Sequence, residues 1–443
     1  MAAKPALYNR IIYSFEVFEH VQLRSGTFTV VVALLALSWL NSPWGEAWLY
    51  TWTTPLNFSF GAFSSSKPLS FWISHVLMAP FFMVLGLELK RVLRVGELKA
   101  WKDAAFPAAA ALGGMLVPAG LYLYMNPDSY QAGWSIVATG DVAAVLALLA
   151  LVGGFLPVAL RVFLSTLVIF QGIATLLLAV VLYTSLQNLL ALSIATGIFG
   201  LLVVLRALRN RSMWLYLLLG FVMLCAFLLA GVNGAVAGVL LAFLIPVHSR
   251  VAEEDFIATA DTVMGQLHGL RMMKRPEPGE EIEEDYQAAV HTLRANCNQA
   301  LSPLRRLQQQ LLPWAGYFVL PLFALAFAPF AYNSFEWQNL FGTVPMGIAL
   351  GLVLGKPIGI LLFVWLASVT RLARIPAGLH WVQLTGAALL AGAGFMLSIF
   401  QAHAVFSDTE LLSLVKISIY LALAVSALLG VILLTAVGKT KGL

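Results

Sequence analysis

Long apolar segments alternate with short charged segments along most of this chain. No Asp, Glu, Lys or Arg occurs from Val162 to Leu205, which leaves room for two membrane-spanning helices of about 20 residues each. Cutting the sequence at its charges and turn residues predicts an all-α membrane protein with about twelve transmembrane helices. We place these spans at about 26–40, 69–89, 104–125, 133–152, 159–183, 187–205, 212–229, 231–247, 312–331, 343–368, 382–405 and 411–436.

The basic residues orient the predicted spans. With a cytoplasmic N-terminus, 23 of the 26 Lys and Arg residues fall on the cytoplasmic side, whereas Lys67 falls outside and Lys356 and Lys416 lie within or near spans. Basic loops mark the cytoplasmic face of bacterial membrane proteins. We therefore expect a multi-pass protein of the bacterial cytoplasmic (inner) membrane with both termini cytoplasmic. We expect no cleaved signal peptide, because Glu16, Glu19 and Arg24 precede the first apolar block.

One charged segment divides the chain into three parts. Residues 1–247 hold spans one to eight, 248–311 form a cytoplasmic charged loop, and 312–443 hold spans nine to twelve. The loop contains an acidic run at 280–285. This run would serve either cation recruitment and partner docking or, as is commoner for such runs, only solvation of the surface.

The composition excludes several classes of protein. The chain is 60% hydrophobic and only 11% charged, against roughly a quarter charged in soluble domains. Its net charge of +5 sits in short loops and not on one soluble face, so we expect membrane lipid and not nucleic acid as a partner. Cys225 and Cys297 are too few for a disulfide framework or a metal cluster. We expect no cofactor and no enzymatic activity.

Two charges lie inside otherwise apolar spans. A charge at the bilayer centre costs at least about 2.5–3.5 kcal/mol, so Asp141 and Lys356 are functional candidates. Gly140 precedes Asp141, and span eleven carries Gly392 and Gly394 at its middle. Such residues loosen helices at membrane depth, which is tolerated where the backbone lines a protein-enclosed or wet cavity. Interrupted helices in the two halves of a chain indicate the centre of a transporter.

The role of Asp141 has two interpretations. It would bind a cation or proton, or it would offset the positive N-terminal ends of broken half-helices while Lys356 offsets the negative C-terminal ends. Glu88 stands beside Lys90 and Arg91, which favours a structural ion pair. His75 is a weaker candidate for titration near neutral pH, since a lone His in a helix is more often a packing residue.

Several strings, in order along the chain, resemble those of the bacterial NhaA family of sodium/proton antiporters. They include Asn41–Glu46 (NSPWGE), Gly86–Arg91 (GLELKR), Ala111–Pro118 (ALGGMLVP), Leu320–Ala324 (LPLFA), Gly355–Gly359 (GKPIG) and Gly394–Phe395 with Ser398. The resemblance implies twelve helices with inverted repeats, in which spans four and eleven are unwound and cross at mid-membrane. It also implies a homodimer, and it equates Asp141 and Lys356 with the family's dipole-balancing aspartate and lysine.

The chain departs from the family where protons are exchanged. The family's pair of adjacent aspartates in span five is replaced by Gln171 and Gly172. Gln171 still offers a carbonyl oxygen to a cation, but neither residue releases a proton. His75 stands where the family has an aspartate. The substitutions elsewhere are Gly140 and Met396 for threonines, Asn233 for a histidine, and Gln308, Gln309 and Leu312 for titrating residues before Pro313–Trp314.

Three hypotheses follow. The first is a secondary transporter that exchanges a small monovalent cation for protons through an altered site, with Asp141, Gln171, Gly172, the Thr139 hydroxyl, Lys356 and His75 along the pathway. The second is transport of another small solute or an anion in the same fold, with Lys356 attracting the anion. The third is a protein that has lost transport and senses or binds a partner through the loop 248–308.

Overall fold

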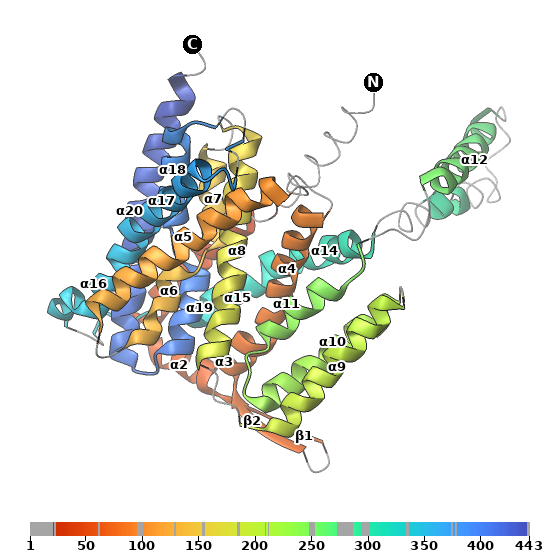
Figure 1. Ribbon diagram of the computed structural model, residues 1–443. Helices are drawn as coiled ribbons and strands as arrows, with labels where there is room; N and C mark the ends of the chain where they lie inside the picture. The colour runs from red at the N-terminus through yellow and green to blue at the C-terminus, as the bar shows by residue number, and fades with distance from the viewer. Residues whose placement is uncertain are drawn as a thin grey trace.

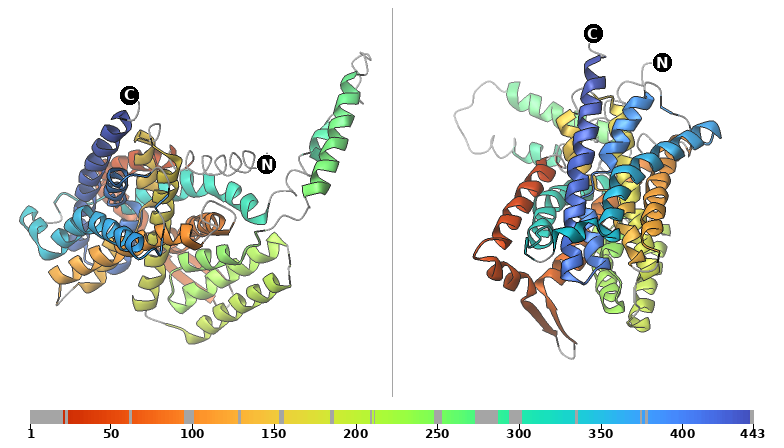
Figure 2. Two further views of the ribbon diagram at one scale, coloured as in Figure 1. Left: turned by 45° about the horizontal axis from the view of Figure 1, so that its top comes forward. Right: turned by 90° about the vertical axis from the view of Figure 1, so that its left-hand side faces the viewer.

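The computed structural model describes residues 21, 24–60, 63–94, 101–127, 130–152, 156–183, 187–208, 210, 212–247, 253–272, 287–293, 302–333, 336–373, 375–376 and 379–440. Figures 1 and 2 show these residues as a bundle of long helices, from which α12 (Glu253–Met272) stands apart. The acidic run at 280–285 and Cys297 lie outside the described residues.

The prediction of an all-α membrane protein is confirmed. Within the described ranges, nine helices are long and apolar enough to cross a membrane, and eleven if each of two bent helix pairs forms one span. The bent pairs are Arg24–Leu40 with Gly45–Thr53, and Trp381–Ala391 with Met396–Val405. A helical element occupies every predicted span, but the count of exactly twelve stays a prediction.

The remaining elements follow in chain order. They are α2 Gly45–Thr53, α3 Leu69–Trp72, the π-helix η1 Ile73–Leu77, α4 Met78–Arg94, α5 Trp101–Met125, η2 Gln131–Gly133, α6 Trp134–Ala138, α7 Val142–Val152, α8 Val158–Tyr183, α9 Leu189–Ala207, α10 Met213–Ala230, α11 Ala235–Leu244, α14 Pro303–Trp314, the π-helix η4 Ala315–Val319, α15 Leu320–Phe327, η5 Trp337–Phe341, α16 Thr343–Leu350, the π-helix η6 Gly351–Gly355, α17 Lys356–Val369, α18 Trp381–Ala391, α19 Met396–Val405 and α20 Thr409–Thr440.

The eighth predicted span is the short helix α11. Its ten residues cover about 15 Å, half of a bilayer core of about 30 Å. Pro246 prevents its continuation, and the Lys90 ammonium donates to the carbonyls of Ala242, Phe243 and Ile245 at its C-terminal end. A lysine at this end offsets the negative pole of the helix. Span nine, in contrast, begins earlier than predicted, since one candidate span runs from Pro303 to Phe327.

A β-hairpin that the sequence analysis did not predict precedes α3. Strands β1 (Pro55–Phe60) and β2 (Phe63–Pro68) pair antiparallel, with Pro55 opposite Pro68 and Phe60 opposite Phe63. In β1, Leu56, Phe58 and Phe60 alternate with Asn57 and Ser59, a period-two pattern typical of strands. Figure 1 shows the hairpin projecting at one end of the helix bundle.

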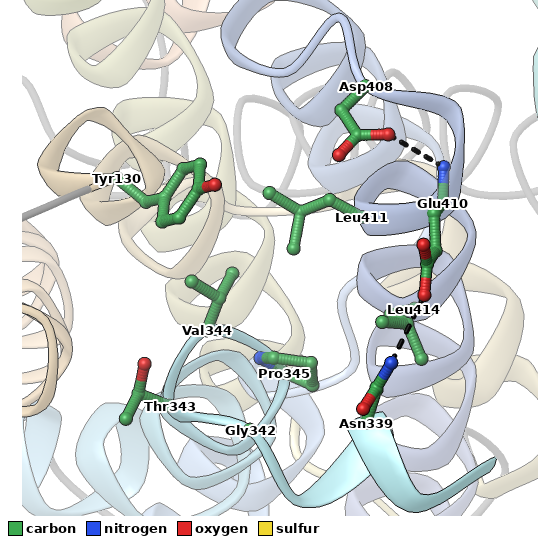
Figure 3. Close-up of a pocket in the computed structure, with 10 residues that line it drawn as sticks. All are labelled: Tyr130, Asn339, Gly342, Thr343, Val344, Pro345, Asp408, Glu410, Leu411 and Leu414. Carbon is green, nitrogen blue, oxygen red and sulfur yellow. Dashed lines mark hydrogen bonds between the residues drawn. The ribbon is translucent and has the colours of Figure 1, made fainter. Parts of the chain in front are cut away.

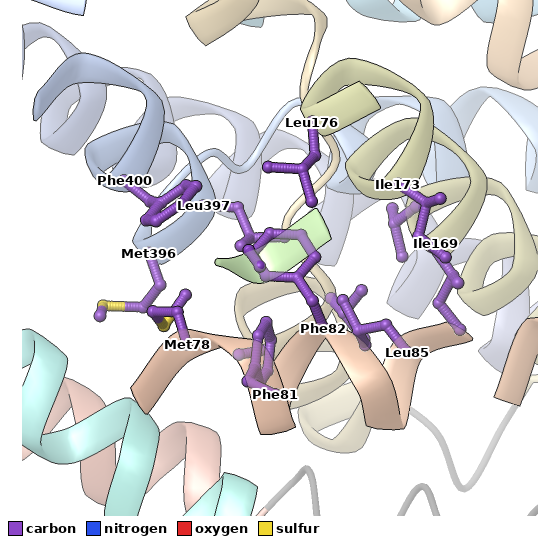
Figure 4. Packing of buried hydrophobic residues seen from close by; sticks show 14 of the residues in the cluster. Met78, Phe81, Phe82, Leu85, Ile169, Ile173, Leu176, Met396, Leu397 and Phe400 are labelled. Atoms are coloured by element: carbon purple, nitrogen blue, oxygen red, sulfur yellow. The ribbon is translucent and has the colours of Figure 1, made fainter. Parts of the chain in front are cut away.

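One part of the extended hydrophobic core lies between α4, α8 and the half-helix α19. Met78, Phe81, Phe82 and Leu85 of α4 face Ile169, Ile173 and Leu176 of α8, and Met396, Leu397 and Phe400 of α19 pack beside them (Figure 4). The ring centroids of Phe82 and Phe400 are 5.6 Å apart. This packing holds the start of α19 against the centre of the bundle. In contrast, α9 and α10 carry exposed apolar side chains such as Leu190, Trp214, Leu218 and Phe221, as expected of surfaces that face lipid.

Candidate ion site at two interrupted helices

The fourth span is interrupted at Asp141. Helix α6 ends at Ala138, Thr139 is extended with φ −70° and ψ 146°, and α7 begins at Val142. The buried Asp141 carboxylate accepts a hydrogen bond from the Ala144 N–H at 3.0 Å, in the first turn of α7. Asp141 therefore caps the half-helix that it precedes.

The same carboxylate also binds the start of α19, across the interruption of span eleven. Its Oδ2 atom accepts from the backbone N–H of Phe395 at 3.1 Å and of Leu397 at 2.7 Å. Gly392 and Gly394 lie in the segment between α18 and α19, whose axes differ by 46°. Two helix N-termini thus point at one carboxylate, and both carry partial positive charge.

Lys356 occupies the opposite pole. Its side chain is fully buried, and its ammonium donates to the carbonyl of Thr139 at the C-terminal end of α6. A helix C-terminus carries partial negative charge, so the ammonium balances it. The contacts of Asp141 and Lys356 are those expected of charges that offset half-helix dipoles.

Gln171 and Gly172 of α8 lie directly against the interruption of span four. A Cβ atom built on Gly140 would lie 2.9 Å from the Gln171 Cβ and 2.5 Å from the Val168 carbonyl oxygen. A Cβ atom on Gly172 would lie 3.3 Å from the Gly140 carbonyl oxygen. Gly140 thus permits the close approach of the interruption to α8. The structure brings the altered pair of span five into the same site as Asp141.

Gln171 has an unused oxygen. Its Nε2 donates to the Ala111 carbonyl at 3.3 Å, which identifies the other amide atom as Oε1. This Oε1 is buried and has no hydrogen-bond partner among the described residues. An unpaired buried acceptor costs about 1–3 kcal/mol, so such an atom in a native fold calls for a ligand, an ion or a water.

Thr175 repeats this feature one helical turn further along α8. Its side chain is fully buried, and its Oγ1 likewise finds no partner in the described part of the chain. Ser165 of the same helix instead donates to the Arg161 carbonyl four residues back, at 2.8 Å, as hydroxyls in apolar helices commonly do. The sequence analysis missed Thr175, although its i+4 spacing from Gln171 was a usable signal.

His75 lies apart from these residues. It belongs to the π-helix η1, its ring stacks on Phe71 with centroids 4.2 Å apart, and its Nδ1 is 2.8 Å from the Ser74 Oγ. None of its hydrogen bonds within the described ranges reaches Asp141 or Gln171. The structure thus brings together Asp141, Thr139, Gly140, Lys356, Gln171 and Gly172, but not His75.

Glu88 forms an ion pair with Arg91 and not with Lys90. The two Arg91 nitrogens Nε and Nη2 donate to the carboxylate at 2.9 and 2.6 Å, and both side chains are buried. Gln308 of α14 donates to the same carboxylate. The cluster ties α14 to the end of α4.

A separate pocket of about 300 Å³ holds none of the predicted site residues (Figure 3). Glu410 lines it, accepting from Asn339 at 3.1 Å, and Asp408 accepts from the Glu410 N–H at the start of α20. These carboxylates have structural partners. Among the described residues, no three His, Cys, Asp or Glu gather in a way that would hold a metal ion. A cation at the crossing would therefore meet one carboxylate and neutral oxygens.

Comparison with known proteins agrees with this geometry. The model of the Na+/H+ antiporter 1 family matches residues 16–434. The chain is 35% identical over 434 residues to the Na(+)/H(+) antiporter NhaA of Koribacter versatilis. The aligned residues cover 98% of this chain and 93% of that protein. It is 34% identical to the NhaA of Oleidesulfovibrio alaskensis, over 98% and 96% of the two chains.

A third relative is the NhaA of Helicobacter pylori strain P12, which is 35% identical over 94% of each chain. These matches run through the interrupted helices, the charged residues and both ends of the bundle, so they concern the whole fold and not one motif. The chain is a multi-pass membrane protein that belongs to the NhaA family of Na+/H+ antiporters.

Proposed function

We propose that this protein exchanges a small monovalent cation for protons through an altered site at the crossing of the interrupted helices. Family membership supports secondary transport. The observation that carries the altered site is the buried Gln171 Oε1 beside the interruption at Gly140, which has no hydrogen-bond partner in the described part of the chain. Hard monovalent cations prefer oxygen ligands, and freed backbone carbonyls supply more of them.

Asp141 is the carboxylate that remains for proton exchange. Three backbone N–H groups already occupy its oxygens, and a carboxylate has about four acceptor positions. One position is left for a cation or proton. Because Gln171 and Gly172 release no proton, each cation exchanges for fewer protons than a site with an additional aspartate pair would allow. We propose electroneutral exchange of one proton for one cation.

The test is cation-dependent collapse of a pH gradient in everted membrane vesicles, with sodium, lithium and potassium from acid to alkaline pH. We expect exchange in the natural protein that is insensitive to a membrane potential. The double variant Gln171→Asp, Gly172→Asp should become potential-sensitive. Absence of exchange in the natural protein at every pH, with activity in the double variant, would refute the proposal.

The alternative, anion transport, requires the Lys356 ammonium to attract the anion. This ammonium donates to the Thr139 carbonyl at the end of α6, so an anion would have to displace that helix end. Anion-dependent currents that vanish in Lys356→Ala would restore that alternative. We retain cation exchange as the function that the site supports best.

We further propose that both termini are cytoplasmic in the bacterial inner membrane and that the protein forms a homodimer embedded in lipid. The basic residues support the orientation, since Lys67 is the one lysine or arginine that falls on the outer side of the predicted spans. The Lys67 ammonium lies 5.4 Å from the ring centroid of Phe71. The family resemblance supports the dimer. Fusions of a periplasm-dependent reporter to each loop test the first, and mass measurement in detergent tests the second.

A further inference from the structure

Lys416 is a buried charge that the proposed exchange does not use. It belongs to α20, lies within the candidate span Thr409–Ala436 and is only 6% exposed. Among the described residues, no carboxylate lies within ion-pair distance of it. Its ammonium instead donates to the Pro329 carbonyl at 2.8 Å. A charge that is kept at membrane depth without an ion pair calls for a task.

Tyr420 lies one helical turn further along α20 and contacts the same segment. Its hydroxyl donates to the Ala328 carbonyl at 3.1 Å. Ala328 and Pro329 directly follow α15, where the helix supplies no further donors to its last carbonyls. Residues four apart share one face of a helix, so Lys416 and Tyr420 hold this helix end together. The ammonium also offsets its negative pole.

The ring of Tyr420 connects this helix end to the ion site. Its centroid lies 5.9 Å from the ring centroid of the buried Phe395. The backbone N–H of Phe395 is one of the donors to the Asp141 carboxylate. One aromatic side chain therefore contacts both the end of α15 and a residue that binds Asp141.

Helix α15 also contacts α19 directly. The rings of Phe323 and Phe400 have centroids 6.0 Å apart, and Phe327 meets the His403 ring edge-on at 4.7 Å. Phe400 and His403 follow Leu397 in α19, and Leu397 provides the shorter hydrogen bond to Asp141, at 2.7 Å. The position of α15 thus bears on the whole half-helix that binds the carboxylate.

We propose that Lys416 and Tyr420 are positioning residues for the exchange. By fixing the end of α15, they hold α19 so that its first N–H groups, those of Phe395 and Leu397, bind the Asp141 carboxylate. Within the described ranges, the hydrogen bonds of both side chains go to the end of α15 and not to Asp141. The inference rests on the proposed function only in taking Asp141 as the exchanging carboxylate.

The first experiment measures amide hydrogen exchange in the purified protein, which requires no transport. We expect the amides of residues 395–397 to exchange about tenfold faster in Lys416→Met, because they lose fixed hydrogen bonds. Peptides from α10, on the opposite side of the bundle from α20 (Figure 1), should stay unchanged. Unchanged amides at 395–397, or equal acceleration in α10, would overturn the proposal.

Three further variants sharpen this experiment. Lys416→Arg keeps the charge and its donors and should behave like the natural protein. Tyr420→Phe removes only the hydroxyl and should accelerate the same amides, which keeps the test open if Lys416→Met does not fold. Ser418→Ala is the matched control, since Ser418 is equally buried in α20 but its hydroxyl donates to the Leu414 carbonyl of its own helix. An effect of Ser418→Ala equal to that of Tyr420→Phe would count against the proposal.

The second experiment separates positioning from a loss of folded protein. In sodium-dependent vesicle exchange, we expect Lys416→Met to raise the half-saturating sodium concentration about fivefold, because a smaller fraction of molecules holds Asp141 in the binding geometry. The maximal rate per folded protein should change less than twofold, and Lys416→Arg should restore the affinity. A lower maximal rate with unchanged half-saturation would refute positioning. Absence of exchange in the natural protein, with the local hydrogen-exchange effect present, would refute the proposed function and not the positioning of α19.

Discussion

Asp141 and Lys356 bind the two ends of one helix interruption. The Asp141 carboxylate accepts from Ala144 at the start of α7, and the Lys356 ammonium donates to Thr139 at the end of α6. Gly140 alone separates Thr139 from Asp141 in the sequence. The charges therefore have opposite and complementary tasks, and removal of either leaves one pole of the interrupted span without its partner.

Asp141→Asn tests the first task. Asparagine keeps the shape but removes the charge that faces two helix N-termini, so we expect a loss of about 3 kcal/mol of stability and less than a tenth of the exchange rate. Thermal unfolding in detergent and vesicle assays measure both. The control is Asp408→Asn, which should cost under about 1 kcal/mol because Asp408 is exposed and Asn caps helices equally well. Equal stability of the two variants would contradict the dipole role.

Lys356→Met tests the coupling of the two charges. The variant leaves the Thr139 carbonyl buried without its donor, and we expect a loss of about 2 kcal/mol. In the double variant with Asp141→Asn, the losses should be less than additive, by about 0.5–3 kcal/mol, because both charges act on one interruption. The double-mutant cycle is measured by unfolding at constant pH. Strict additivity would mean that the charges act independently.

Gly140→Ala tests the close approach of the interruption to α8. A methyl group there would press on the Val168 carbonyl oxygen at 2.5 Å. Backbone does not yield cheaply, so we expect destabilisation by about 1–3 kcal/mol and loss of exchange. Gly197→Ala in α9 is the control, since no described residue beyond its own helix backbone and chain neighbours lies within 4 Å of its Cβ position. It should be neutral or stabilising by up to about 1 kcal/mol. Similar behaviour of both variants would show that Gly140 is replaceable.

Much of the fold was predictable because lipid imposes long apolar helices, and intramembrane charges stand out in them. The interruptions at Gly140–Asp141 and Gly392–Gly394 were predictable as well, because glycine loosens a helix and a charge is costly at membrane depth. Three features were not. The β-hairpin has too short a period-two pattern to stand out beside the helices. The buried hydroxyls of Thr175 and Ser426 have no hydrogen-bond partner among the described residues, but in the sequence they look like any threonine or serine whose hydroxyl bonds to its own helix. The π-helix η6, in which the Lys356 N–H donates to the Gly351 carbonyl five residues back, packs against α5 and α20 and leaves no pattern in the sequence beyond Pro357.

Gln308→Glu tests the cluster that ties α14 to α4. The Gln308 amide donates to the Glu88 carboxylate, which Arg91 already neutralises. A glutamate would place a second negative charge against it in a buried position, so we expect destabilisation by about 1–3 kcal/mol at pH 8. Gln309→Glu, at the exposed neighbouring position, should show no such loss. Unfolding temperatures of the two variants decide the matter: equal stability of Gln308→Glu and Gln309→Glu would mean that the second carboxylate reaches water and that the cluster is open to solvent at this end of the bundle.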